Sequence, residues 1–254
     1  MGSSLAFMFL SNYMIKLTLK IFIMIFLMGA ENVMYKKVIK IWREKNTEDL
    51  LKKVVVKFIY CSNKLENDET RLRDVEAIFN GEKVIDFNGS EKTIKEIERQ
   101  RELCINIFRL SKEVVKTKLS MEVIEQVYFA ITGNNVERDL YGSIDKLIQE
   151  INSMEINDKN ALEVVSYFYC YFQTVSNYDG RVGRMLINYF LVANNLPPIT
   201  IFYVDKEEYY KALSYFNKRQ DISIMIEFLD SQAFKTWLKD YNLKIRSLKD
   251  FLDD

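Results

Sequence analysis

Apolar side chains recur every three or four residues along most of the chain after residue 33. One such run is formed by Leu51, Val54, Val55, Phe58 and Ile59. This spacing is typical of amphipathic helices. The chain also holds only 8 Gly and 2 Pro, which favours long helices over a sheet with many turns. The pattern therefore predicts an all-α fold.

Polar residues and glycines mark where these helices begin and end. Ser120 is placed to open a helix that Gly133 closes, and Thr70 to open one that ends before Gly81. Asp205 begins a capping-box pattern for a helix near the C-terminal end. No repeat, low-complexity tract or clear linker divides the pattern, so we expect one helical domain.

Residues 1–33 differ from this pattern. Their apolar run, residues 5–28, is interrupted by two lysines, and the clean stretch that remains is shorter than the ~20 residues of a membrane span. Three interpretations are open: an upstream start codon, with Met28 or Met34 as the real beginning; a membrane anchor or signal; or a genuine first helix. The domain itself is expected over residues 34–254.

Composition narrows the function classes. Lys+Arg and Asp+Glu balance at 36 each, so no global field attracts nucleic acid. The cysteines Cys61, Cys104 and Cys170 lack C-x-x-C spacing, which argues against a disulfide framework or zinc site and fits a reducing cytoplasm. The chain contains no histidine, which excludes Ser-His-Asp, Cys-His and histidine-metal chemistry.

The stretch from residue 172 to 184 lies between two strongly apolar helical patterns and is interpreted as helix, polar loop and helix start. Gly180, Arg181 and Arg184 stand where a helix N-terminus offers free N–H groups, the usual place to hold phosphate. This stretch resembles the Fic-family signature H-x-F-x-D/E-G-N-G-R-x-x-R. These three residues match it, whereas Gln173 stands in the place of the signature histidine.

Four further positions depart from the signature. Val175 replaces the phenylalanine, Asn177 the acid, Tyr178 the first glycine and Asp179 the asparagine. The half of the signature that grips phosphate is therefore retained, and the catalytic half is lost.

Two other patches support the resemblance. Ser62, Glu66 and Asn67 fit the family's N-terminal inhibitory-helix pattern S/T-x-x-x-E-G/N, and an apolar run after Arg184 is similar to the run that follows the signature in Fic proteins. The resemblance implies an all-α Fic-like domain with an inhibitory helix that ends near residue 67. It further implies that Glu66 pairs with Arg184 and obstructs the γ-phosphate.

The resemblance implies AMP transfer from ATP to a protein hydroxyl, with ATP, Mg²⁺ and a protein target as partners. The nucleotide would lie against Asn177, Tyr178, Asp179, Gly180, Arg181 and Arg184. Asn177 is a weak, neutral magnesium ligand, and Tyr178 would crowd the phosphate loop. The stretch 133–142, where Fic proteins carry a β-hairpin flap that binds the target, is very short here.

Loss of the base leaves two functions open. A glutamine amide at position 173 cannot accept a proton near neutral pH, although it can orient a hydroxyl. The protein is therefore expected to be a weak or altered nucleotidyltransferase. The alternative is a pseudoenzyme that binds a nucleotide or a protein partner. A cytoplasmic location is expected, with membrane association only if residues 5–28 are a real anchor.

Overall fold

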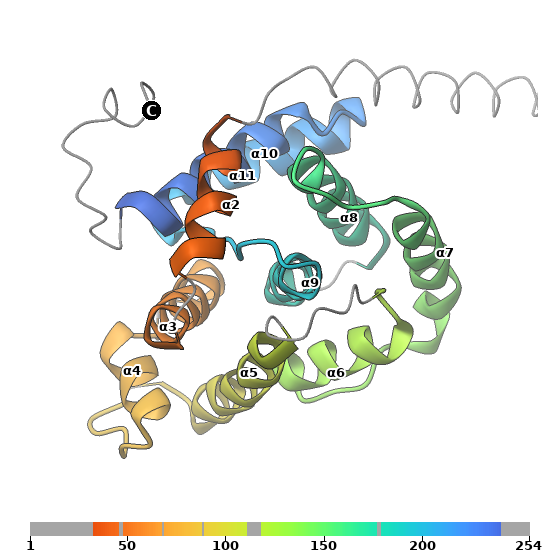
Figure 1. Cartoon of the computed structure of the whole chain (residues 1–254). Coiled ribbons are helices and arrows are strands. Elements are labelled where there is room, and N and C mark those ends of the chain that lie inside the picture. Colours follow the sequence, from red (N-terminus) through yellow and green to blue (C-terminus); the bar gives the residue numbers. More distant parts are fainter. Residues whose placement is uncertain are drawn as a thin grey trace, which may run out of the picture. The chain divides into compact units, whose positions relative to one another are not determined.

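A computed structural model describes residues 33–45, 48–67, 69–87, 89–110, 118–176 and 179–239. The chain divides into two units, residues 1–32 and 33–254, and the first lies outside the described residues. The three interpretations of the apolar segment therefore stay predictions. Across the described part of the second unit the elements are helical and none is a strand, so the all-α prediction is confirmed (Figure 1).

The long helices in chain order are α2 (Val33–Lys45), α3 (Glu48–Glu66), α4 (Leu72–Asn80), α5 (Glu91–Leu110), α6 (Met121–Thr132), α7 (Tyr141–Ser153), α8 (Ala161–Ser176), α9 (Gly180–Ala193), α10 (Lys206–Arg219) and α11 (Ser223–Phe234). Short 3₁₀ turns η1 (Arg138–Leu140) and η2 (Tyr203–Asp205) precede α7 and α10, and a π-helical turn, Lys235–Lys239, follows α11.

Helix α9 forms the centre of the domain. Every residue from Arg181 to Ala193 is buried, as expected for a helix that is apolar on nearly all sides. Helices α3, α5, α6 and α8 pack against it, and Figure 1 shows it inside a ring of the other helices. The first turn of α9 therefore lies at one end of the core, within reach of α3 and α5.

The sequence located some helix ends correctly. The Ser120 hydroxyl accepts a hydrogen bond from the Val123 N–H at the start of α6, and Gly133 ends that helix in the left-handed conformation. Gly81 ends α4 in the same way, but Thr70 does not open it. The Thr70 hydroxyl instead donates to Asn67, because the chain turns there before α4 begins.

The predicted capping box at Asp205 is wrong. Its side chain makes no cap hydrogen bond to α10. The carboxylate instead accepts from Gln232 at 2.9 Å and from Lys235 at 2.6 Å, because α11 and the turn after it pack beside the start of α10. The Asp205 carboxylate therefore forms an ion pair with the distant Lys235 and not a capping hydrogen bond with α10.

The stretch where Fic proteins carry a flap contains only the turn η1 before α7. Residues 133–142 form no strand, which confirms the prediction of a short or missing hairpin. None of the helices in the described ranges is both long and apolar enough to cross a membrane. Residues 5–28 lie outside those ranges.

Candidate functional site

In the signature stretch α8 ends at Ser176 and α9 begins at Gly180, as the predicted order of two helices requires. Asp179 is the N-cap of α9, and its carboxylate accepts a hydrogen bond of 2.9 Å from the Arg181 N–H. Asn177 and Tyr178 lie outside the described residues, so their predicted roles stay predictions. The free N-terminus expected to hold a phosphate already carries a carboxylate of the chain.

Arg184 is the most buried charged residue of this site, with a side chain 1% exposed. Its Nη2 donates to Glu66 Oε1 at 2.7 Å and to the Ser62 carbonyl at 2.8 Å. Its Nε donates to the Ser62 hydroxyl at 3.0 Å. The structure thus brings together Glu66 and Arg184, the two residues that the resemblance pairs, and adds Ser62 as a further partner, whereas the inhibitory role of that contact stays a prediction.

Two buried tyrosines complete the surroundings of Arg184. Its Nη1 donates to the Tyr209 hydroxyl at 3.2 Å, and that hydroxyl is hydrogen-bonded to the hydroxyl of Tyr169. Burial by itself lowers the pKa of Arg184, but interactions with Tyr209, Tyr169 and Glu66 outweigh it and raise that pKa. Burial raises the pKa of Tyr169 well above its ordinary value. Arg184 is therefore a permanent cation.

Gly180 allows this cluster to close. A Cβ atom added at Gly180 would lie 2.7 Å from Arg184 Nη1 and 2.9 Å from Glu66 Oε1. The first matching residue of the signature is thus a position where the chain packs directly on the ion pair.

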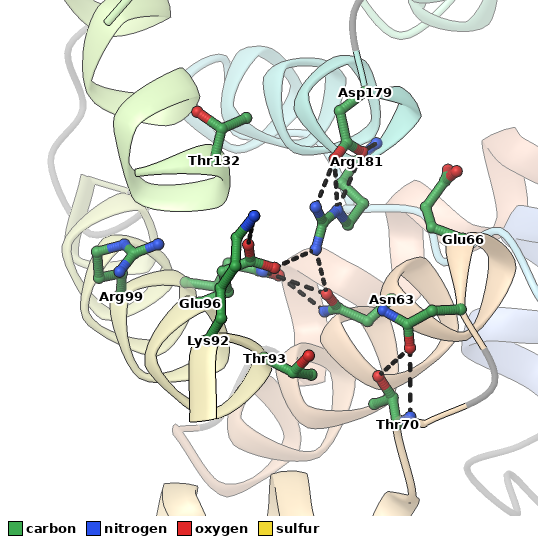
Figure 2. A network of polar contacts seen from close by, with 12 residues as sticks. Asn63, Glu66, Thr70, Lys92, Thr93, Glu96, Arg99, Thr132, Asp179 and Arg181 are labelled. Carbon is green, nitrogen blue, oxygen red and sulfur yellow. Dashed lines mark hydrogen bonds and ion pairs between the residues drawn. The ribbon is translucent and has the colours of Figure 1, made fainter. Parts of the chain in front are cut away.

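Arg181 has its own set of acceptors, shown in Figure 2. Its Nε lies 2.9 and 3.0 Å from the two carboxylate oxygens of Asp179. Its Nη1 donates to Glu96 on α5 at 2.7 Å and to Asn63 on α3 at 3.0 Å. The side chain is only 10% exposed. All these acceptors belong to the protein, and two of the three side chains are carboxylates.

The charges of this network support one another. Burial on its own raises the pKa of Asp179, but hydrogen bonds and the positive charge of Arg181 outweigh it, and the pKa of Asp179 is lowered. Burial on its own lowers the pKa of Arg181, and Asp179 and Glu96 reverse this and raise it. Both groups therefore stay charged at neutral pH.

Gln173, at the position of the signature histidine, contacts the start of α9. A Cβ atom added at Gly183 would lie 2.6 Å from Gln173 Nε2. That nitrogen is buried and has no hydrogen-bond partner within the described part of the chain. The amide therefore fills space between α8 and α9.

The predicted inhibitory motif ends helix α3, which stops at Glu66. The Asn67 side chain accepts a hydrogen bond of 3.1 Å from the Thr70 hydroxyl and so holds the turn toward α4. From the other side, Lys206 donates to the Leu65 carbonyl at 2.9 Å and caps the helix end. The carboxylate of Glu66 keeps 30% exposure.

The carboxylates of this site are not arranged to bind a magnesium ion that is held on a nucleotide. Both oxygens of Asp179 accept from Arg181, and Glu96 and Glu66 are paired with arginines. Over the ranges given above, no group of three or more acidic or cysteine ligands is gathered as a metal site would require.

The sequence did not reveal Glu96, Asn63 or Gln100. Asn63 donates to Gln100 Oε1 at 3.0 Å and accepts from Arg181. Glu96 and Gln100 are four residues apart and therefore share one face of α5. Both are buried, and this pair of polar residues on a buried face was the available signal. Tyr209 lies in a patch that carried the resemblance, but nothing in its spacing indicated a contact with Arg184.

No protein-family model and no curated protein sequence matches this chain. Solved structures do. A Fic-domain signalling protein from Bacteroides thetaiotaomicron is similar with a TM-score of 0.65 and 15% identity, over 80% of this chain and 95% of the other. Fic-1 from C. elegans has a TM-score of 0.62 at 16% identity, over 81% of this chain and 70% of the other.

A Fic family protein from Desulfovibrio desulfuricans gives a TM-score of 0.61 at 14% identity, over 81% of this chain and 71% of the other. At these identities the likeness concerns the fold. Together with the central helix α9 and the arginines at its start, it gives a plain conclusion: this chain has the Fic fold.

Proposed function

We propose that this protein is a Fic-fold pseudoenzyme, a binding protein that does not transfer AMP. The observation that carries the proposal is the state of Gln173. Its amide has no capacity to accept a proton, its Nε2 is buried against Gly183, and no histidine exists elsewhere in the chain to replace it. Loss of a general base typically lowers a rate by ~10²–10⁴.

The pairing of the arginines adds support. In AMP transfer, Arg181 and Arg184 would stabilise phosphate charge, which requires donors that face the nucleotide. Here their donors are directed at Asp179, Glu96, Glu66 and Ser62. A nucleotide would have to displace these groups before it could bind.

A second candidate is a weak nucleotidyltransferase under inhibition. The observation in its favour is the contact between Glu66 and Arg184, which is the pair that the family's inhibitory motif would form. Under this function, Glu66→Gly would release Arg184 for the γ-phosphate of ATP.

Incubation with α-labelled ATP and magnesium, followed by detection of labelled protein, tests both. The pseudoenzyme proposal expects no label on the natural protein, with or without Glu66→Gly. It expects label after Gln173→His, Asn177→Asp, Tyr178→Gly and Asp179→Asn are combined with Glu66→Gly, because these changes restore the histidine, the acid, the first glycine and the asparagine of the signature. Labelling of the natural protein, or of the Glu66→Gly variant alone, would refute the proposal and favour the second candidate.

A further inference from the structure

The two signature arginines are neutralised by different carboxylates. Glu66 lies on Arg184, while Asp179 and Glu96 lie on Arg181. The acids come from three separate elements: the end of α3, the start of α9 and the first turns of α5. Removal of Glu66 would therefore leave the partners of Arg181 in place.

Asp179 binds both groups that could attract a phosphate here, namely the backbone N–H in the first turn of α9 and the guanidinium of Arg181. Its Oδ1 accepts from the Arg181 N–H in the first turn of α9, and both oxygens face the Arg181 guanidinium. Carboxylate and phosphate make the same kind of bonds to an arginine fork. An external phosphate would thus compete with a carboxylate that is covalently attached two residues away.

Glu96 holds the remaining side of Arg181. It is buried, lies 2.7 Å from Arg181 Nη1, and comes from α5, which packs along α9 (Figure 2). Lys92 contacts it from the solvent side at 3.9 Å, but that lysine is 75% exposed. Two buried arginines therefore face three carboxylates, so their positive charge is already compensated within the protein.

We propose that Asp179 and Glu96 are internal ligands of Arg181 that take the place of a phosphate group and decide, independently of Glu66, whether this site binds anions. The inference rests on the proposed function, since it explains what the signature site does in a protein without catalysis. It names Asp179 and Glu96 as the two residues that keep anions out of the signature site.

The charge of Asp179 can be removed with little change of shape. Asp179→Asn keeps a side-chain oxygen for the N-cap, a position where asparagine and aspartate are equally favourable. Asp221→Asn is the matched control, because Asp221 likewise accepts from the backbone N–H two residues on, at 2.8 Å, at the start of α11. Glu98→Gln, at an exposed position on α5, is the control for Glu96→Gln.

The experiment is calorimetry of the full chain with inorganic triphosphate as probe. We expect no measurable binding by the parent, by either control or by Glu66→Gln. Asp179→Asn should bind, and Asp179→Asn with Glu96→Gln should bind at least about ten-fold more tightly than Asp179→Asn alone, as for loss of one charge-assisted pair. Thermal unfolding of each variant shows whether it is folded.

Folded Asp179→Asn with the parent's affinity would overturn the proposal, even if the double variant failed to fold. A full gain from Glu66→Gln alone would overturn it as well, since Glu66 would then control the site. The probe contains no transferable AMP, so the result is separate from the labelling test. Labelling by the natural protein would refute the proposed function and leave this measurement to decide on Asp179 and Glu96.

Discussion

Replacement of Arg184 by methionine is the most direct test of how the domain is held together. The arginine joins α9 to α3 through three hydrogen bonds, and methionine keeps much of its length without the charge. The variant would remove the donor that the Ser62 carbonyl and hydroxyl share. It would also leave Glu66 beside an apolar side chain.

The expected loss follows from burial. Removal of one partner of a buried ion pair costs about 3–5 kcal/mol. Because Glu66 is 30% exposed and water can solvate it after the change, we take the lower end, about 3 kcal/mol. A domain of this size loses roughly 2–4 °C in melting temperature per kcal/mol. Arg184→Met should therefore melt roughly 6–12 °C below the parent protein.

Glu66→Gln should have a smaller effect. The amide keeps an acceptor for Arg184 at a partly exposed position, so we expect a loss of about 1 kcal/mol, or roughly 2–4 °C. Arg138→Met is the control for a change of arginine to methionine, since Arg138 is exposed in η1. That control should melt with the parent.

Differential scanning calorimetry of the four proteins at pH 7 provides the comparison. The order expected for the loss of melting temperature is Arg184→Met, then Glu66→Gln, then Arg138→Met. The reasoning fails if Arg184→Met melts within about 2 °C of the parent, or if it is no less stable than Glu66→Gln. Arg184 would then contribute little to the contact between α9 and α3.

Three further outcomes can be measured by thermal unfolding. Gly180→Ala should lower the melting temperature because the added Cβ would meet the pair of Glu66 and Arg184. Gly142→Ala, in α7, is the control: its added Cβ would have no atom within 4 Å, so the melting temperature should stay unchanged or rise. Asp179→Asn should be less stable than the parent at pH 7, and the gap should narrow only as the pH falls below about 4, the ordinary pKa of an aspartate, because the lowered pKa of Asp179 makes its charged form the stabilising one. Glu163→Gln should be the more stable form at pH 7 but not at pH 4, because burial raises the pKa of Glu163 and folding disfavours its charge. Equal pH profiles for either acid and its amide would contradict the assignment.

The fold was predictable because helical periodicity survives in nearly every segment of the chain. The apolar run from Leu51 to Ile59 became the buried face of α3, and Gly81 and Gly133 ended helices where their backbone freedom is needed. Thr70 was assigned wrongly as a cap, because its hydroxyl binds Asn67 outside α4. Asp205 does stand at the N-cap position of α10, but its side chain makes no capping hydrogen bond because it accepts from Gln232 and Lys235.

The site was predictable only in part, and for a different reason. The contact between Glu66 and Arg184 joins residues 118 apart in the sequence, and it came from the resemblance. The contact between Glu96 and Arg181 spans 85 residues and has no such precedent in the signature. Hydrophobic periodicity identifies the face of α5 that is buried but does not show which polar residue on that face is satisfied by a distant arginine.

The three signature residues that this chain retains all lie where α9 meets other helices. Gly180 packs on the pair of Glu66 and Arg184, Arg184 holds the end of α3, and Arg181 holds both α3 and α5. A buried arginine cannot lose its partners without leaving a charge uncompensated, which costs several kcal/mol.

Gln173, at the position of the base, makes no comparable contact between helices through its amide nitrogen. Its amide nitrogen makes no hydrogen bond to the described part of the chain, so it does not tie α8 to another helix. The presence of two arginines at the start of α9 is thus fully accounted for by packing and charge. Phosphate binding has to be demonstrated separately, with the carboxylates of Asp179 and Glu96 as its competitors.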